Sequence, residues 1–90
     1  MMSATILSDA DLASLTAAKV VDARGTACPG PLLEAKKGMG TVKVGDVIEL
    51  LSSDPDTKKD VSAWSGKVGH EYLGVLVASG YERVFVRRQK

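Results

Sequence analysis

The chain's single cysteine, Cys28, is the side chain best suited to covalent chemistry, and it stands beside two prolines. Pro29 follows it directly and Pro31 comes two residues later, so the stretch reads Cys-Pro-Gly-Pro. Proline lacks a backbone N–H and has a fixed φ, and a helix tolerates both properties in its first turn. The spacing therefore predicts that Cys28 precedes a helix with Pro29 as its first residue. Gly30 keeps its N–H and would let other chains approach closely.

A thiol in this position is expected to be reactive. The N-terminus of a helix carries roughly half a positive charge, which stabilises a thiolate and lowers the thiol pKa below its free value of about 8.5. Arg24, four residues earlier, adds positive charge to the same loop. A lone cysteine is often a small buried hydrophobic residue, but Ala27 and Pro29 do not form an apolar strand around it. The local sequence favours an exposed functional thiol.

The rest of the chain limits the chemistry open to Cys28. A dithiol redox enzyme needs a second cysteine, and a cysteine hydrolase needs a neighbouring base. His70 is the only histidine, and its place after Gly69 is more typical of contact with the last-turn carbonyls of a helix. One cysteine and one histidine cannot supply a closed zinc site, so we expect no metal and no cofactor. The remaining possibility is that the Cys28 thiol carries a chemical group to a partner protein.

The hydrophobic pattern predicts the elements that would position this thiol. Strands are expected over 19–23, 45–53, 71–79 and 82–88, and helices over 29–39 and 53–70. The second strand is nearly continuously apolar, as a central strand would be. The last strand should place Val84 and Val86 inward, with Arg83, Phe85 and Arg87 on the other face.

The two helices are expected to differ in their ends and in their buried stripes. The first should bury Leu32, Ala35 and Met39, and the second Val61, Trp64 and Val68. Asp54 is expected to cap the second helix, with Pro55 at its first position and Gly69 ending it.

The order β-α-β-α-β-β predicts the α/β (α+β) class. We expect a two-layer sandwich in which a four-stranded mixed sheet carries both helices on one face. Residues 1–19 read as a peripheral N-terminal extension with a short helix that presents Leu12 and Leu15, capped by Ser8. Residues 20–90 form the domain.

Charge and hydropathy suggest little about partners by themselves. The formal net charge is +1, and the basic residues cluster toward the C-terminus. The start has neither a basic segment nor a continuous apolar segment of the kind found in signal peptides. No apolar run approaches the roughly 20 residues of a membrane span. We therefore expect a cytoplasmic protein that does not contact membranes. Lys36, Lys37, Arg87 and Arg88 are the candidate docking residues for a partner.

The stretch from Asp22 to Pro31 resembles the signature of the TusA/SirA sulfur-carrier family, in which Cys-Pro-x-Pro follows Asp-x-x-Gly. "GDVIELLSSDP" is similar to the family's second strand and the turn after it, and "DVSAWSGKVGHEYL" to its second helix with the Gly-His pair. The resemblance covers about residues 20–88. It implies the same β-α-β-α-β-β sandwich and a persulfide carried on Cys28, with Asp22 and Gly25 shaping the loop. Gly30 stands where several tRNA-thiolation members carry a charged residue.

The resemblance also implies partners. A rhodanese, a cysteine desulfurase or a DsrE-type carrier would donate sulfur, and a partner cysteine would accept it. The downstream routes are tRNA thiolation, cofactor assembly and sulfur oxidation, and direct contact with nucleic acid is not expected.

The residues are also compatible with two other classes of protein. One is an RNA-binding module that uses Arg83, Phe85 and Arg87 on an open sheet face. The other is a protein-interaction domain in which Cys28 is a bystander.

Overall fold

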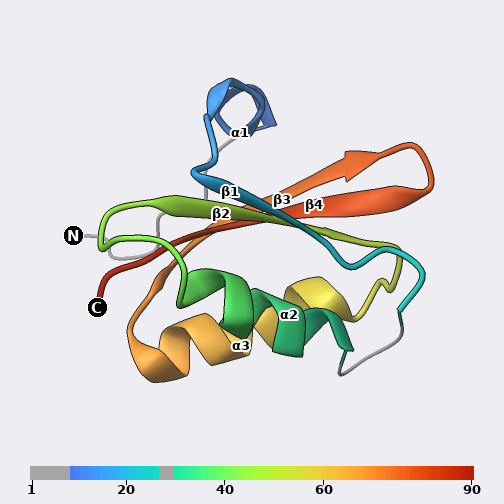
Figure 1. Cartoon of the computed structure of the whole chain (residues 1–90). Helices are drawn as coiled ribbons and strands as arrows, with labels where there is room; N and C mark the ends of the chain where they lie inside the picture. The colour runs from blue at the N-terminus through green and yellow to red at the C-terminus, as the bar shows by residue number, and fades with distance from the viewer. Residues whose placement is uncertain (1–8, 27–29) are drawn as a thin grey trace.

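The structure is a computed structural model that describes residues 9–26 and 30–90. It contains three helices and four strands in these ranges, in the order α1 (Asp9–Ser14), β1 (Lys19–Asp22), α2 (Gly30–Met39), β2 (Val47–Ser52), α3 (Thr57–Val68), β3 (Glu71–Ala78) and β4 (Tyr81–Arg87) (Figure 1). None of the helices in these ranges is long and apolar enough to cross a membrane.

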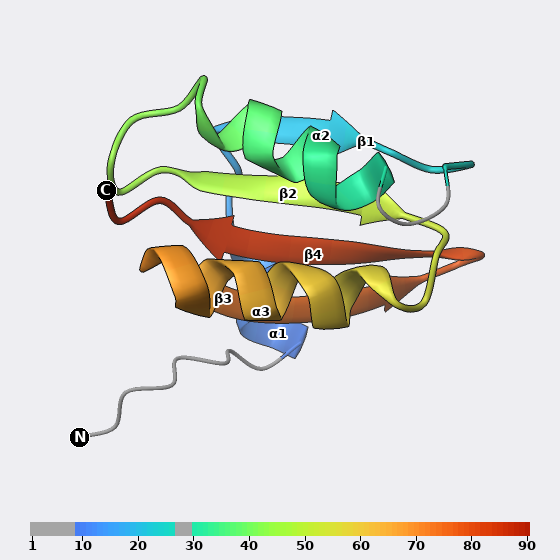
Figure 2. The ribbon, with the colours of Figure 1, turned by 90° about the horizontal axis from the view of Figure 1, so that it is seen from below.

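The strands form one mixed sheet in the order β1-β2-β4-β3. β1 and β2 are parallel, whereas β4 runs antiparallel to both β2 and β3. α2 lies over the β1–β2 half of the sheet and α3 over the β4–β3 half (Figure 2). This confirms the predicted class and the placement of both long helices on one face. β2 is central, in agreement with its nearly continuous apolar sequence.

The main core lies between this sheet face and the two long helices. Ile48 and Leu50 of β2, Val84 and Val86 of β4, and Val61 of α3 are fully buried there. α2 approaches β1 closely at Gly38, where an added Cβ would lie 2.6 Å from Cγ2 of Val21. Only a glycine allows the helix to pack at this distance.

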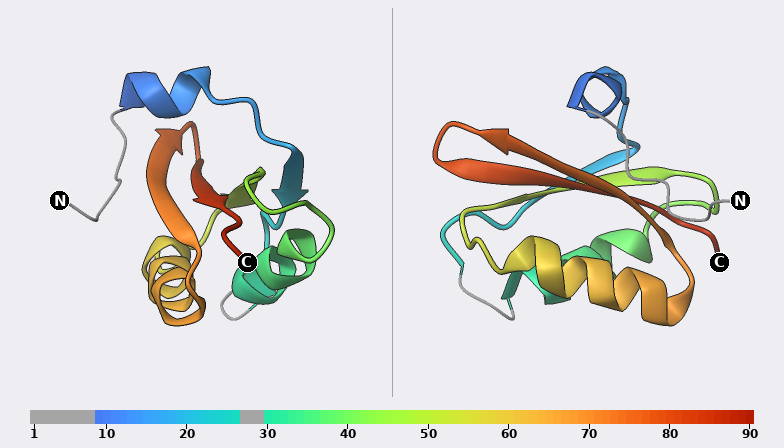
Figure 3. Two further views of the ribbon diagram at one scale, coloured as in Figure 1. Left: turned by 90° about the vertical axis from the view of Figure 1, so that its left-hand side faces the viewer. Right: turned by 180° about the vertical axis from the view of Figure 1, so that it is seen from behind.

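The opposite sheet face carries a second, smaller core under α1 (Figure 3). Leu12 of α1 is 1% exposed and packs with Leu73 of β3 and Phe85 of β4, both of which are fully buried. The prediction that Phe85 lies on the face opposite Val84 and Val86 is confirmed, but the prediction that this face is open at Phe85 is wrong. Its ring is covered by a helix from the N-terminal segment, and the RNA-binding alternative loses its aromatic platform. Ser8, the predicted cap of this helix, lies outside the described residues.

The second long helix begins later than predicted. α3 starts at Thr57, while Asp54 acts in the preceding turn, where its Oδ1 accepts the N–H of Asp56 at 2.9 Å. Pro55 belongs to this turn and not to the helix. The buried positions of α3 are Thr57, Val61 and Ser65. Val68 is 37% exposed, so the predicted stripe was correct at Val61 and wrong at Val68.

The remaining element bounds differ from the predicted ones by one or two residues, which is within the usual uncertainty of strand and helix ends. Gly69 ends α3 as predicted, with φ +89° and its N–H bonded to the carbonyl of Ser65 at 2.9 Å.

Candidate functional site

The loop that leads to Cys28 leaves the sheet where the parallel strands β1 and β2 both end. Its described part, residues 23–26, lies beside the turn from β2 to α3 and beside the β3–β4 hairpin (Figure 1). Cys28, Pro29 and Ala27 lie outside the described residues, so the predicted roles of Cys28 and Pro29 stay predictions. The geometry on both sides of them is described.

Hydrogen bonds to the end of β2 fix the first part of this loop. The N–H of Ala23 donates to the carbonyl of Leu51 at 2.8 Å and continues the β1–β2 ladder by one residue. Gly25 has φ +85°, which favours glycine, and its N–H donates to Oγ of Ser53 at 3.0 Å. The chain therefore turns away from the sheet at a defined point before it reaches Cys28.

Thr26 joins this turn to the start of α2. Its hydroxyl donates to the carbonyl of Ala23 at 2.6 Å. An added Cβ at Gly30 would lie 3.0 Å from the Thr26 methyl group, so Thr26 packs closely against Gly30. Pro31 is buried in the first turn of α2. Both ends of the segment that holds Cys28 are thus attached to the fold.

Asp22 and Arg24 form an ion pair at the base of the loop. Nε of Arg24 donates to Oδ1 of Asp22 at 2.9 Å and Nη2 donates to Oδ2 at 2.8 Å. These bonds, together with the Arg24 backbone N–H, lower the pKa of Asp22 from 3.8 to about 2. The guanidinium also lies 4.8 Å from the ring centroid of Tyr81. Arg24 therefore already has a counter-ion and an aromatic contact.

The turn from β2 to α3 has its own polar support. The hydroxyls of Ser52 and Thr57, both buried, are 2.7 Å apart. The N–H of Asp54 donates to the same Ser52 hydroxyl at 3.1 Å. This network holds Ser53 where it accepts the N–H of Gly25, and the two turns border a shallow hollow lined by Gly25, Thr26, Ser53 and Asp54.

The four predicted docking residues do not lie together. Lys37 pairs with Glu34 on α2 at 3.4 Å, and Arg87 pairs with Glu71 at 2.7 Å on the sheet face away from the long helices. Lys36 and Arg88, by contrast, line one groove between α2 and α3. Arg88 donates from Nη1 to the carbonyl of Met39, near the C-terminal end of α2, and from Nε to the carbonyl of Lys90.

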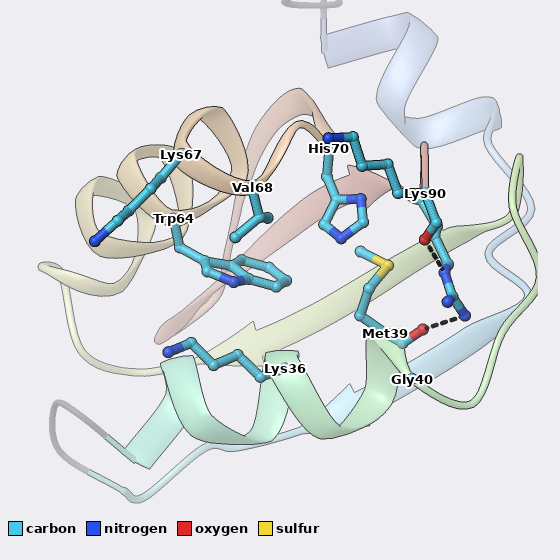
Figure 4. A pocket seen from close by; sticks show the side chains of 9 residues that line it. Lys36, Met39, Gly40, Trp64, Lys67, Val68, His70 and Lys90 are labelled. Carbon is cyan, nitrogen blue, oxygen red and sulfur yellow. Dashed lines mark hydrogen bonds between the residues drawn. The ribbon is translucent and has the colours of Figure 1, made fainter.

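The groove has a volume of about 480 Å³, and Figure 4 shows its side chains from close by. It is lined by Lys36, Met39, Gly40, Trp64, Lys67, Val68, His70, Arg88 and Lys90. His70 lies edge-on to Trp64, with ring centroids 5.5 Å apart, and its Nδ1 accepts the N–H of Gln89 at 3.1 Å. Partial burial, with Arg88 and Lys90 nearby, lowers the pKa of His70.

The backbone of His70 follows the prediction, since its N–H bonds to the last-turn carbonyl of Ser65 at 2.8 Å, but its ring does not. The ring is instead part of the groove.

Sequence reasoning missed Ser53 and Tyr81 beside the loop and Trp64, Lys67 and Lys90 in the groove. Ser53 is 28 residues away from Gly25 in the sequence, and no local sequence pattern predicts a contact between them. The helical spacing from Val61 predicts that Trp64 packs on the core, and it does so, but it is only partly buried and also lines the groove. The exposed Lys67 beside it could have suggested a surface position.

The family comparison agrees with this architecture. The family described as "Sulfurtransferase TusA" matches residues 19–88, which is most of the chain, so the chain belongs to the TusA family of sulfurtransferases and sulfur carriers. The match begins at β1, and α1 lies before it.

Individual relatives carry related descriptions. A putative sulfur carrier protein of Archaeoglobus fulgidus is 48% identical over 71 residues, which cover 79% of this chain and 97% of the relative. A putative sulfur carrier protein of Bacillus subtilis is 41% identical over 69 residues, which cover 77% of this chain and 37% of that relative. The crystal structure of a SirA-like protein from Desulfitobacterium hafniense has a TM-score of 0.64 at 24% identity, covers 80% of this chain and 99% of its own, and shows the shared fold.

Proposed function

We propose that this chain accepts a sulfane sulfur atom as a persulfide on Cys28 and passes it to a cysteine of a partner protein. The observation that carries the proposal is that the fold holds the chain on both sides of the Cys-Pro-Gly-Pro segment. Residues 23–26 are bonded to the end of β2, and Gly30 and Pro31 begin α2. Membership of a sulfur-carrier family supports the same chemistry and implies a donor protein and an acceptor protein.

Loading is a transfer between sulfur atoms. The thiolate of Cys28 attacks the terminal sulfur of a donor persulfide and forms a new S–S bond. The donor S–S bond breaks at the same time, and the donor cysteine leaves as a thiolate. No net oxidation occurs, because the sulfane sulfur moves with its oxidation state unchanged.

Unloading repeats the exchange in the other direction. A thiolate of the acceptor protein attacks the outer sulfur on Cys28, the Cys28 S–S bond breaks, and Cys28 returns to a thiolate. The reaction requires a nucleophilic thiol that is a good leaving group, and a lowered pKa supplies the second property. Cys28 in this account needs no base, so the account assigns no catalytic role to His70.

The described residues contribute by position and charge. The ten-residue helix α2 directs its positive end toward the segment that holds Cys28. Its first turn has no acidic residue to cancel that field. Arg24 is paired with Asp22, so we assign the lowered thiol pKa mainly to the helix and treat the ion pair as support for the loop.

The rate of alkylation of Cys28 as a function of pH tests whether the thiol is activated. We expect the midpoint of the rate profile to lie below the value of about 8.5 for a free cysteine. The Cys28→Ser variant provides the blank. A midpoint at or above the free value, from folded protein, would instead support a bystander cysteine and the protein-interaction alternative.

A further inference from the structure

The groove between α2 and α3 is a basic concave surface. Lys36 comes from α2, Lys67 from α3, and Arg88 and Lys90 from the segment after β4 (Figure 4). No Asp or Glu side chain lines this groove. Because these cations come from three separate segments, their meeting is a property of the fold and not of one basic run.

The lysines of the groove differ from most basic residues elsewhere in the chain. Lys58, Arg83 and Arg87 each pair with a glutamate at 3.1 Å or less. Arg24 and Lys37 pair with Asp22 and Glu34. Among residues 9–26 and 30–90, by contrast, no ion pair forms at Lys36, Lys67 or Lys90. Their charge is therefore available to an outside anion.

A simple alternative is that these cations only stabilise helix ends. Lys36 and Lys67 do lie in the last turns of α2 and α3, where cations complement the helix dipole. However, Arg88 already donates to the carbonyl of Met39, the last residue of α2, and to that of Val42. The end of α3 also accounts for Lys90, whose side chain lies against Gly69. Helix ends do not explain why an apolar floor lies between the charges.

That floor consists of Trp64, Met39 and Val68. Trp64 is half-buried and Val68 is 37% exposed, so both present apolar surface between the cations. Protein interfaces place an aromatic anchor at the centre and charged residues at the rim. The groove has this composition.

We propose that the groove docks an acidic segment of a partner protein, whose carboxylates pair with Lys36, Lys67 and Lys90 while an apolar side chain packs on Trp64. That this partner is the sulfur donor or acceptor rests on the proposed function. Lys36 lies six residues after Gly30, the first residue of α2. The groove therefore begins about 9 Å along the helix axis from the helix start that follows Cys28. A partner held there is close enough to reach the thiol with its own loop.

The chain offers clean reporters for a test. Its only tryptophan and its only histidine both line the groove. The probe is a short synthetic glutamate-rich peptide with one leucine and no aromatic residue, added to the full chain. We expect a saturable change in Trp64 fluorescence that weakens with added salt. The His70 ring signals should move in NMR spectra, with a rise in the pKa of His70 because carboxylates favour the imidazolium.

Matched variants separate the groove from general basicity. Lys67→Ser and Lys36→Ser should each weaken binding by about two- to fivefold, as expected for single exposed pairs. Lys59→Ser on α3 and Lys37→Ser on α2 remove the same charge outside the groove lining and should change it by less than about 1.5-fold. The double variant Lys36→Glu/Lys67→Glu should weaken binding by at least about tenfold.

Three results with peptides would each overturn the inference. They are no saturable change, equal losses in the groove variants and their controls, or equal binding of a peptide with lysine in place of glutamate. Tighter, groove-dependent binding of a single-stranded RNA oligonucleotide would assign the groove to nucleic acid and would also overturn it. Circular dichroism on each variant controls for folding.

The test is independent of the persulfide chemistry. The Cys28→Ser variant should bind the peptide as the wild type does, and the lysine variants should still load sulfur from a small-molecule donor. A chain that binds the peptide but does not load sulfur would reject the proposed function and leave the docking proposal standing. Loss of binding with loading intact would reject the groove alone.

Discussion

At the scale of single residues, the loop before Cys28 is defined by contacts that are remote in sequence. Ser53 accepts the N–H of Gly25, and Tyr81 lies against the guanidinium of Arg24. Asp22, the first residue of the family signature, holds Arg24 through both carboxylate oxygens. Asp22, Arg24 and Gly25 thus contact one another or the chain beside β2 and β4, and the two charged side chains among them are paired.

The carboxyl group of Asp22 should titrate at about 2 in the folded protein, compared with a usual value of 3.8. Because the folded pKa is the lower one, the contribution of Asp22 to stability is present above about pH 4 and is lost as the pH falls toward 2. NMR titration of its side-chain carbonyl measures the midpoint. Replacing Arg24 with Gln should raise this midpoint toward the usual value. A wild-type midpoint near 3.8 would show that the pair does not form in solution.

At the scale of elements, the position of α2 depends on its close contact with β1. Replacing Gly38 with Ala would place a Cβ 2.6 Å from Cγ2 of Val21, whose branched side chain has little freedom to move. Overpacking should outweigh the gain in helix propensity and lower the free energy of unfolding by about 1–2 kcal/mol. Denaturant titration measures the change.

Gly66 provides the matched control, because it lies in α3 and an added Cβ there meets nothing within 4 Å. Gly66→Ala should raise the free energy of unfolding by about 0.5–1 kcal/mol. Equal effects of the two substitutions would contradict the close packing of α2 on β1.

The short helix α1 covers Phe85 through one fully buried leucine. Replacing Leu12 with Ala should leave a cavity over Phe85 and Leu73 and lower the free energy of unfolding by about 2–3 kcal/mol. Leu33→Ala on α2 removes the same atoms from a side chain that is 51% exposed, and should cost less than about 1 kcal/mol. If Leu12→Ala were no more costly than this control, α1 would not be docked in solution.

At the scale of the whole molecule, the sequence was sufficient for the element order, the central place of β2 and the placement of both long helices on one face. Those features follow from local apolar patterns and from chain connectivity. The cover over Phe85 could not be predicted, because it depends on Leu12 meeting β3 and β4 from more than sixty residues away.

The site was predictable only in part. The Cys-Pro-Gly-Pro segment marks the start of a helix by its own chemistry, and α2 does begin at Gly30. Ser53 and Tyr81 meet the loop only after the sheet has formed, and the groove exists only where α2, α3 and the end of β4 converge. Lys36 and Lys37, adjacent in sequence, reach different surfaces because successive residues of a helix point in different directions.

The central claim is that Cys28 carries sulfur, and intact-mass spectrometry after incubation with a sulfane-sulfur donor tests it most directly. The account predicts a gain of whole sulfur atoms that a reductant reverses and that the Cys28→Ser variant does not show. A folded chain with a free thiol that gains no sulfur from several donors, or a Cys28→Ser variant that gains it equally, would contradict the account.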